Sequence, residues 1–256
     1  MAGSNPASDR KGLVEICVLE VRNLTKIYRK LEERVEGIEN ASLKISAGEI
    51  IGLIGPNGAG KTTLIKLITT VLEPDSGEIL FEGERMDKGS KRKIGYVPEN
   101  PFFYTNLKGW ELARFMESIY QADLEEGGRL SFVQLAKRLN VEEYLGKFVS
   151  SYSQGILRKF LLSLAIAFGT RLIILDEPTN GLDPDSYISL KEILKECRED
   201  NRAVLIATHQ LPMAQEIVDK IAICYNGRIQ SFTIKDETVE ELYRNIVHRN
   251  REVRVK

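Results

Sequence analysis

The stretch that decides the fold spans residues 49–63 and reads EIIGLIGPNGAGKTT. Residues 50–54 form a continuous apolar run, which is typical of a buried parallel strand. The residues that follow match G-x-x-x-x-G-K-[ST], a phosphate-binding loop in which backbone N–H groups turn toward phosphate oxygens while the lysine and hydroxyl complete the cradle. We therefore expect nucleotide binding at the following positions: Asn57, Gly58, Ala59, Gly60, Lys61, Thr62 and Thr63.

A pair of carboxylates ends a second apolar run, LIILDE at residues 172–177. Asp176 lies where a carboxylate is costly without a cation or donors nearby, so it is expected to serve a magnesium ion together with Thr62. Glu177 stands where it can activate water as a general base. Taken alone, Glu177 is equally consistent with an ordinary helix-start carboxylate or an ion-pair partner.

The remaining pattern indicates an α/β fold: a P-loop NTPase core with a mostly parallel sheet, an antiparallel β subdomain at the N-terminal side and an inserted helical subdomain. An alternating strand from residue 13 to 21 is predicted at a sheet edge, and a short strand follows at residues 41–45. A helix is predicted over residues 61–72 and another over 186–197, the latter joining buried strands at 172–175 and 203–208 in a β-α-β unit. Residues 99–168 change to helical character and indicate an inserted subdomain.

Composition limits the possible functions of the chain. Its 256 residues suffice for one sizeable core. With 36 Lys+Arg against 37 Asp+Glu the formal charge is −1, so no nucleic-acid partner is expected. The longest apolar stretch, residues 160–168, is far short of the roughly 20 residues that span a bilayer. Three cysteines without C-x-x-C spacing suggest neither a disulfide framework nor a zinc site and fit a reducing compartment.

The domain boundaries predicted from these patterns divide the chain into three parts. Residues 1–12 are small and polar and are expected to be a disordered leader, without the apolar region of a signal peptide. Residues 13–232 form the ATPase domain. Residues 233–256 form a tail with a helix near 237–247 and a basic end, for which a solvated surface is the default interpretation.

In order and spacing, these segments resemble the nucleotide-binding subunits of ABC transporters, over nearly everything from Leu19 to Arg228. Ser153-Gln154-Gly155, 23 residues before Asp176, corresponds to the signature motif. Ser153 is a good N-cap, and a serine, a glycine amide and a helix N-terminus form an anion site. A Ser-x-Gly sequence before a helix is common, and only this position makes it informative. The resemblance implies that this site meets the γ-phosphate held by a second copy, in a head-to-tail dimer around two ATP molecules.

The resemblance assigns roles to four more residues. Tyr28 matches the aromatic side chain that stacks on adenine, although a half-buried tyrosine on an edge strand has the same pattern. Asp183 matches the loop that crosses the dimer interface, and a plain turn is its alternative. His209 matches the switch histidine that contacts the γ-phosphate and takes part in catalysis. Glu99 stands where most members carry a metal-touching glutamine, and a carboxylate also ligates magnesium.

Two departures, Glu99 and the divergent signature Tyr152-Ser153-Gln154-Gly155-Ile156, resemble the ABC-2-type exporter branch. The resemblance implies ATP and Mg²⁺ as cofactors, a second copy or a homologous ATPase subunit as partner, and a polytopic membrane permease. It also implies a cytoplasmic subunit attached to the inner face of the membrane through that partner. Three alternatives stay open: a soluble ABC ATPase of repair, translation or iron–sulfur assembly; a P-loop GTPase or small-molecule kinase; and a cassette that binds ATP without turnover.

Overall fold

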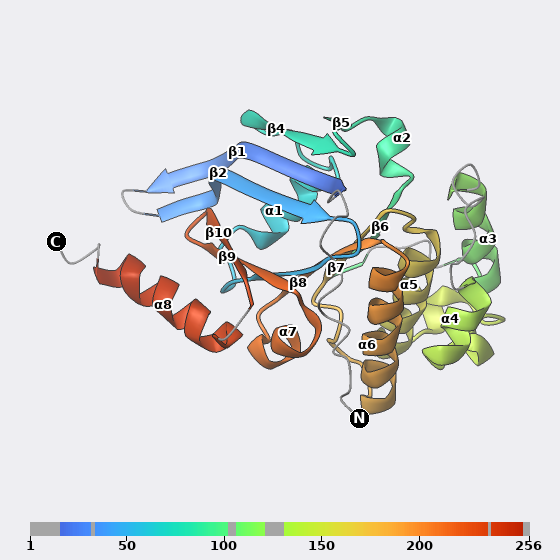
Figure 1. Cartoon of the computed structure of the whole chain (residues 1–256). Helices are drawn as coiled ribbons and strands as arrows, with labels where there is room; N and C mark the ends of the chain where they lie inside the picture. The colour runs from blue at the N-terminus through green and yellow to red at the C-terminus, as the bar shows by residue number, and fades with distance from the viewer. Residues whose placement is uncertain (1–15, 32–33, 102–105, 121–130, 235–236, 253–256) are drawn as a thin grey trace, which may run out of the picture.

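A six-stranded sheet carries the phosphate loop at the end of a central strand (Figure 1). The structure is a computed structural model that describes residues 16–31, 34–101, 106–120, 131–234 and 237–252. The strand order is β10-β9-β3-β8-β7-β6, and every neighbouring pair is parallel except β9 with β10. The strands are β3 Ile50–Ile54, β6 Ile94–Val97, β7 Leu172–Asp176, β8 Ala203–Thr208, β9 Lys220–Tyr225 and β10 Arg228–Thr233. This arrangement confirms the predicted mostly parallel core.

The central strands are buried on both faces because each face packs against a separate core. Successive side chains of a strand point to opposite faces. Ile50 and Ile54 of β3 accordingly belong to a core that includes residues of α5 Gln154–Phe168, α6 Pro184–Glu199 and α7 Leu211–Ile217. Ile51 and Leu53 belong to the other core, with α1 Lys61–Ile68 and the second sheet. Because β3 is buried on both faces, its sequence is apolar at successive positions instead of alternating.

The second sheet is antiparallel and has the order β2-β1-β4-β5. Its strands are β1 Cys17–Leu31, β2 Arg34–Ser46, β4 Ser76–Phe81 and β5 Glu84–Arg85. The predicted sheet-edge position of the first strand is wrong, because β1 pairs with β2 on one side and with β4 on the other. The predicted strand at 41–45 is also much too short. Polar residues and several register shifts interrupt the alternation on which the prediction depended.

The helical region between β6 and β7 contains α3 Gly109–Tyr120, α4 Phe132–Arg138 and α5, with short 3₁₀ turns η3 Glu142–Tyr144 and η4 Val149–Ser151. Helix α5 packs against both α4 and β6, so it joins this region to the main sheet (Figure 1). The short helix α2 Lys88–Lys91 precedes β6, and α8 Val239–Glu252 follows the last strand. In the part of the chain that the structure describes, no helix is long and apolar enough to cross a membrane.

The structure corrects the bounds of two helices and adds two strands that were not predicted. Helix α1 ends at Ile68 instead of continuing to residue 72, because the run Ile68-Thr69-Thr70-Val71 is β-branched and Thr70 has φ 55°. Strands β9 and β10 were not predicted, although the two-residue turn Asn226-Gly227 between them, with φ 48° and 76°, is a strong hairpin signal. Helix α8 begins at Val239, after a Thr238/Glu241 capping box. The predicted leader, residues 1–12, lies outside the described residues.

Candidate nucleotide-binding site

The phosphate loop joins β3 to α1 and depends on two glycines with positive φ. Gly58 has φ 77° and Gly60 has φ 113°. A Cβ on Gly60 would lie 2.5 Å from the Gly37 carbonyl oxygen, so the loop packs closely on β2. Gly60 caps α1 without a side-chain hydrogen bond, which leaves the first N–H groups of the helix directed toward the loop. This geometry provides the backbone donors that an anion requires.

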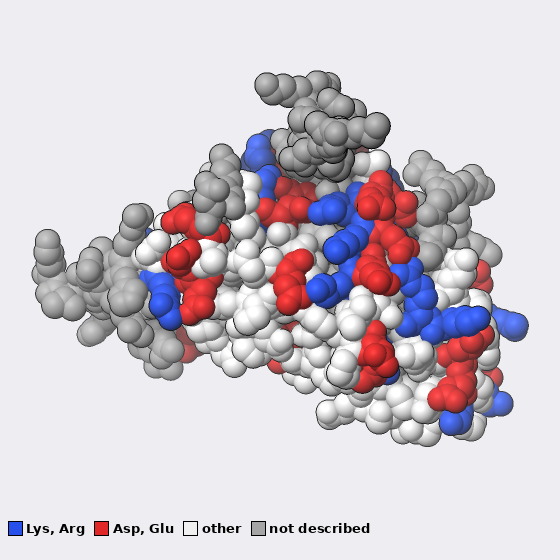
Figure 2. All heavy atoms as spheres, turned by 60° about the horizontal axis from the view of Figure 1, so that its bottom comes forward, with Lys and Arg blue, Asp and Glu red and all other residues white. Residues whose placement is uncertain are grey.

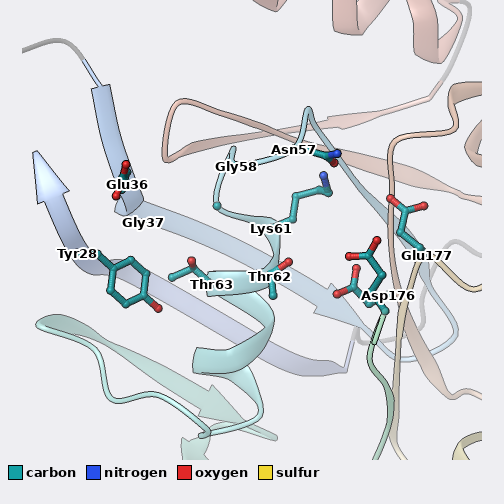
Figure 3. A pocket seen from close by; sticks show the side chains of 12 residues that line it. Tyr28, Glu36, Gly37, Asn57, Gly58, Lys61, Thr62, Thr63, Asp176 and Glu177 are labelled. Atoms are coloured by element: carbon teal, nitrogen blue, oxygen red, sulfur yellow. The ribbon is translucent and has the colours of Figure 1, made fainter. Parts of the chain in front are cut away.

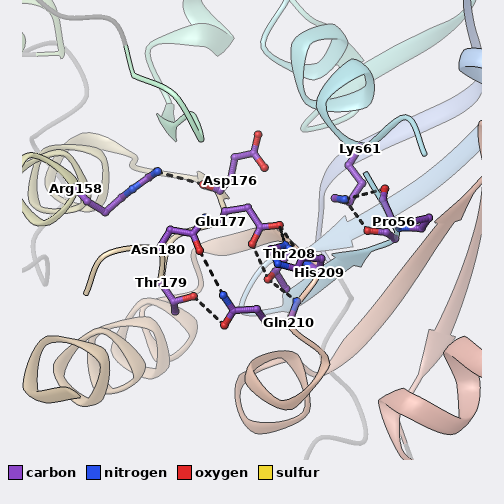
Figure 4. A network of polar contacts seen from close by, with 11 residues as sticks. Pro56, Lys61, Arg158, Asp176, Glu177, Thr179, Asn180, Thr208, His209 and Gln210 are labelled. Carbon is purple, nitrogen blue, oxygen red and sulfur yellow. Dashed lines mark hydrogen bonds and ion pairs between the residues drawn. The ribbon is translucent and has the colours of Figure 1, made fainter. Parts of the chain in front are cut away.

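Lys61 occupies the first turn of α1 and is 7% exposed. Its Nζ donates to the carbonyl oxygens of Gly55 at 2.6 Å and Pro56 at 3.2 Å (Figure 4). Both carbonyl acceptors are neutral, so they do not compensate the buried ammonium charge. The arrangement favours an anion at the mouth of the loop.

One cavity of about 470 Å³ gathers most of the predicted site residues (Figure 3). The phosphate loop lies between Tyr28 and Glu36 on one side and the carboxylates of Asp176 and Glu177 on the other. Sequence reasoning missed Glu36 and Gly37, which line the same cavity. Of the predicted nucleotide and metal residues, those in the lining are Tyr28, Asn57, Gly58, Lys61, Thr62, Thr63, Gly60, Glu99, Asp176 and Glu177. Ala59 is not in this lining and is buried.

Tyr28 reaches the cavity from an irregular part of β1. Ile27 pairs with Gly37 and Arg29 with Glu36, so Tyr28 is the extra residue of a β-bulge. A bulge changes the direction in which a side chain points and is frequent beside binding sites. Tyr28 is 54% exposed, which leaves its ring accessible for stacking.

Asp176 ends β7 and is 2% exposed. Burial, followed by repulsion from Glu99 and Glu177, raises the pKa of Asp176 to about 6. Among the described residues, its carboxylate has no hydrogen-bond or ion-pair partner. A buried carboxylate in this state is suited to a cation that the nucleotide brings.

Glu177 has a strained backbone and a fully engaged side chain. Its φ is 47°, a region that costs non-glycine residues about 1–2 kcal/mol. One carboxylate oxygen accepts from the Thr208 hydroxyl at 3.0 Å, and the other accepts from the His209 N–H at 3.0 Å and lies 2.6 Å from His209 Nδ1 (Figure 4). The His209 side chain is 54% exposed and is absent from the cavity lining. The structure therefore places Glu177 and His209 in direct contact.

Arg158, on α5, was not identified from the sequence. It is 6% exposed, and its guanidinium donates to the carbonyl oxygens of Pro98 at 2.8 Å, Glu99 at 2.5 Å and Asp176 at 3.3 Å. Burial lowers the pKa of Arg158. The available signal was a pair of adjacent cations, Arg158 and Lys159, in the otherwise apolar helix 154–168. Arg158 fixes the backbones that carry both Glu99 and Asp176.

The signature segment lies outside this cavity. Ser153 caps α5 by accepting from the Ile156 N–H at 3.3 Å, and both Ser153 and Gln154 are exposed. A Cβ on Gly155 would lie 2.6 Å from the Gly181 carbonyl oxygen, so this segment packs against the loop that leads to Asp183. Asp183 caps α6 and pairs with Lys159, and these contacts lower the pKa of Asp183 to about 2. None of Ser153, Gln154, Gly155 and Asp183 is among the described lining residues.

Comparisons with known proteins all point to ABC transporter ATP-binding proteins. The family model described as ABC transporter matches residues 38–180. An uncharacterized ABC transporter ATP-binding protein of Synechocystis is 32% identical over 239 residues, covering 90% of this chain and 66% of that protein. The lantibiotic transport ATP-binding protein SrtF of Streptococcus pyogenes is 31% identical over 230 residues, covering 89% of this chain and 96% of that protein.

A solved structure described as the ATP binding subunit of an ABC transporter superposes with a TM-score of 0.79 at 29% identity. The match covers 90% of this chain and 99% of that chain. Among the two sequence relatives, this chain spans 66% of the length of the Synechocystis protein, slightly less than two thirds, and 96% of the length of SrtF.

Proposed function

The chain belongs to the ABC transporter family, and we propose that it is an ATP-binding and ATP-hydrolysing subunit that drives a separate membrane protein. The observation that carries this proposal is the single cavity in which Lys61 lies between the phosphate loop and the carboxylates of Asp176 and Glu177. Such a cavity offers donors to phosphate oxygens on one side and acceptors to a cation or a water on the other.

The residues of the cavity, together with His209 at the end of β8, bind and hydrolyse ATP in this proposal. Tyr28 stacks on the base, and the N–H groups of residues 58–62 with Lys61 bind the phosphates, assisted by Asn57 and Thr63. Glu177 accepts a proton from the attacking water, and His209 contacts the γ-phosphate and orients the Glu177 carboxylate. Because the Glu177 oxygens already accept from Thr208 and His209, the carboxylate is held in one orientation before a water arrives.

The donor set fits a magnesium ion. The cavity is lined by three oxygen donors of the kind that Mg²⁺ prefers, from Thr62, Glu99 and Asp176. The buried Asp176 carboxylate has no partner in the described part of the chain, so a bound cation would compensate its charge. Among the described residues, no group of three or more His, Cys, Asp or Glu side chains would hold a metal by itself. The ion would therefore share its coordination with phosphate oxygens. When bound, it supplies positive charge that offsets the charge developing on the phosphates.

The signature segment supports a second copy, or a homologous subunit, as partner. Ser153, Gln154 and Gly155 present an exposed helix N-terminus away from the chain's own cavity, with Asp183 close to them. We expect this surface to complete the cavity of the partner in a head-to-tail dimer around two Mg-ATP.

A polytopic membrane protein is the second proposed partner, and the direction of transport is export. SrtF, a lantibiotic transport ATP-binding protein, matches over 96% of its length, and both Glu99 and Gln154 depart from the usual family pattern in the same direction. Trp110 and Phe115 on α3 are 40% and 47% exposed and offer an apolar surface for such a partner. Phe102, Phe103 and Tyr104, which the sequence places beside them, lie outside the described residues. The subunit would then lie at the cytoplasmic face of the membrane.

The surface charge supports a protein partner over nucleic acid. On the face drawn in Figure 2, acidic and basic side chains intermingle instead of gathering into one basic patch. Ion pairs such as Arg138–Glu196 and Arg198–Asp219 join cations to carboxylates of the same chain. A soluble ABC ATPase acting in repair, translation or iron–sulfur assembly is the alternative function. Co-purification with a polytopic membrane protein, compared with nucleic acid or a scaffold protein, discriminates between them.

Steady-state hydrolysis tests the proposal. Wild-type protein should release phosphate from Mg-ATP, Lys61→Ala should lose nucleotide binding and turnover together, and Glu177→Gln should lose about 10²–10⁴-fold in rate while still binding ATP. Wild-type turnover no higher than that of Lys61→Ala would contradict the assignment and would favour a cassette that binds without turnover.

A further inference from the structure

Gln210 connects two loops beside the cavity through its side-chain amide (Figure 4). Its Nε2 donates to Asn180 Oδ1 at 3.3 Å, and its Oε1 accepts from the Thr179 hydroxyl at 3.4 Å. Both distances are long for hydrogen bonds, so each contact is weak alone and the connection depends on the pair. Thr179 and Asn180 belong to the loop after Glu177, whereas Gln210 follows His209. The amide therefore joins the two segments that carry Glu177 and His209.

The backbone of Gln210 also determines the orientation of a hydroxyl. The Gln210 N–H donates to Thr208 Oγ1 at 3.0 Å, and Thr208 Oγ1 lies 3.0 Å from Glu177 Oε2. Because a backbone N–H can only donate, the hydroxyl uses a lone pair toward Gln210 and keeps its proton for the carboxylate. A continuous chain of hydrogen bonds thus runs from Gln210 through Thr208 to Glu177.

Glu177 requires such support because its backbone is strained. Its φ of 47° persists only where the surroundings determine it. Its N–H donates to the Ala207 carbonyl oxygen at 2.8 Å, and its own carbonyl oxygen accepts from the Asn180 N–H at 3.2 Å. Asn180 is thus bonded both to the Glu177 backbone and to the Gln210 amide. Movement of Asn180 would release one of the two backbone contacts that hold the strained residue.

We propose that Gln210 is a positioning residue: it clamps the 179–180 loop to the end of β8 and so holds the Glu177 carboxylate in its orientation for hydrolysis. The inference rests on the proposed function, because it assigns Glu177 the role of general base. The Gln210 side chain acts through Thr179 and Asn180 and is absent from the described lining of the nucleotide cavity, whereas the backbone N–H that orients Thr208 remains in any side-chain variant. Its loss should accordingly lower the rate of the chemical step and leave nucleotide affinity unchanged.

The experiment compares Gln210→Ala and the nearly isosteric Gln210→Met with the wild-type chain and with Gln215→Ala. Gln215 is a matched control, because its side chain also makes a hydrogen bond, to the Val239 N–H at 2.7 Å, but joins α7 to α8 instead of the two loops. We expect both Gln210 variants to lose about tenfold in kcat with KM for Mg-ATP within twofold, a smaller loss than the 10²-fold that a 1 Å misplacement can cause. Gln215→Ala should keep both constants within twofold.

Hydrogen exchange provides a readout that does not require turnover. The Leu182 N–H donates to the Thr179 carbonyl oxygen at 3.1 Å, so it reports on the same loop as the Asn180 N–H. Both amides should exchange at least fivefold faster in the two Gln210 variants than in wild type and Gln215→Ala. If the wild type does not hydrolyse ATP, the proposed function fails, and the exchange rates alone show whether Gln210 holds the 179–180 loop. Unchanged exchange overturns the proposal, as does a normal kcat in Gln210→Met, which would assign the effect of alanine to lost packing. A raised KM with normal kcat also overturns it.

Discussion

Replacement of Asp176 by Asn should stabilise the nucleotide-free protein at neutral pH, although Asp176 is a proposed ligand. The carboxylate is 2% exposed, and burial with repulsion from Glu99 and Glu177 raises its pKa from 3.8 to about 6. At pH 7.5 the group is ionised in both the folded and the unfolded chain, but only the folded chain keeps the charge buried. Asparagine has nearly the same shape and carries no charge.

The expected size follows from the two pKa values. One pKa unit corresponds to about 1.36 kcal/mol, so a rise from 3.8 to about 6 lowers the free energy of unfolding by at most about 3 kcal/mol. The carboxylate lines an open cavity where water screens part of this cost, and we expect about 1–2 kcal/mol. For a chain of this size, that difference raises Tm by about 2–8 °C in Asp176→Asn.

The destabilisation caused by the Asp176 charge should decrease as the pH falls. Because the folded pKa is raised, the cost is complete above about pH 6, falls to about half near pH 5, and disappears below about pH 3.8, where both states are protonated. The wild-type chain should thus approach the stability of the variant as the pH falls through this window.

Thermal unfolding of both proteins at pH 7.5, 6 and 5 in EDTA measures this difference. Asp185→Asn is the matched control, since Asp185 is exposed in the first turn of α6 and its replacement should lower Tm slightly by weakening the helix-dipole interaction. A variant less stable than wild type at pH 7.5, or an increase in Tm that does not shrink toward pH 5, would refute the electrostatic reasoning.

Further substitutions test other parts of the site. Tyr28→Ala should raise the Kd for ATP about tenfold while Tyr28→Phe stays within twofold, as measured by nucleotide titration, because stacking on a base contributes about 1–3 kcal/mol and needs only the ring; equal losses in both variants would contradict stacking. Arg158→Lys should lower the free energy of unfolding by about 2–3 kcal/mol in urea titrations, because an ammonium cannot serve the carbonyl groups of Pro98, Glu99 and Asp176 together. An unchanged urea midpoint would show that the contacts of this guanidinium with the three carbonyl groups do not stabilise the fold.

Local sequence predicts structure best where the residues that determine a feature lie close together in the chain. The loop at residues 55–63 combines glycine conformations with a lysine in a single short segment, and the structure places it between β3 and α1 as expected. Strand β1 shows the limit, because its second partner, β4, is more than 40 residues away in the chain and leaves no local signal. The end of α1 and the Asn226-Gly227 hairpin were readable from β-branched residues and turn chemistry, and the predictions did not use those signals.

Positions defined by long-range contacts could not be predicted in the site either. Arg158 contacts carbonyl groups about 60 residues earlier and 18 residues later, and backbone carbonyls carry no side-chain pattern. The contact of Glu177 with Thr208 and His209 arises because β7 and β8 are parallel neighbours that end at the same edge of the sheet. Sequence identifies these residues one by one, whereas the sheet topology brings them together.

We propose that one chain carries two complementary half-sites, one around Lys61 and one around Ser153. The most direct measurement is the sedimentation of Glu177→Gln with and without Mg-ATP, because this variant should bind ATP without consuming it. We predict a monomer without nucleotide, a dimer with saturating Mg-ATP, and a monomer in both conditions when Lys61→Ala is added. A Glu177→Gln protein that stays monomeric at saturating Mg-ATP would contradict the claim.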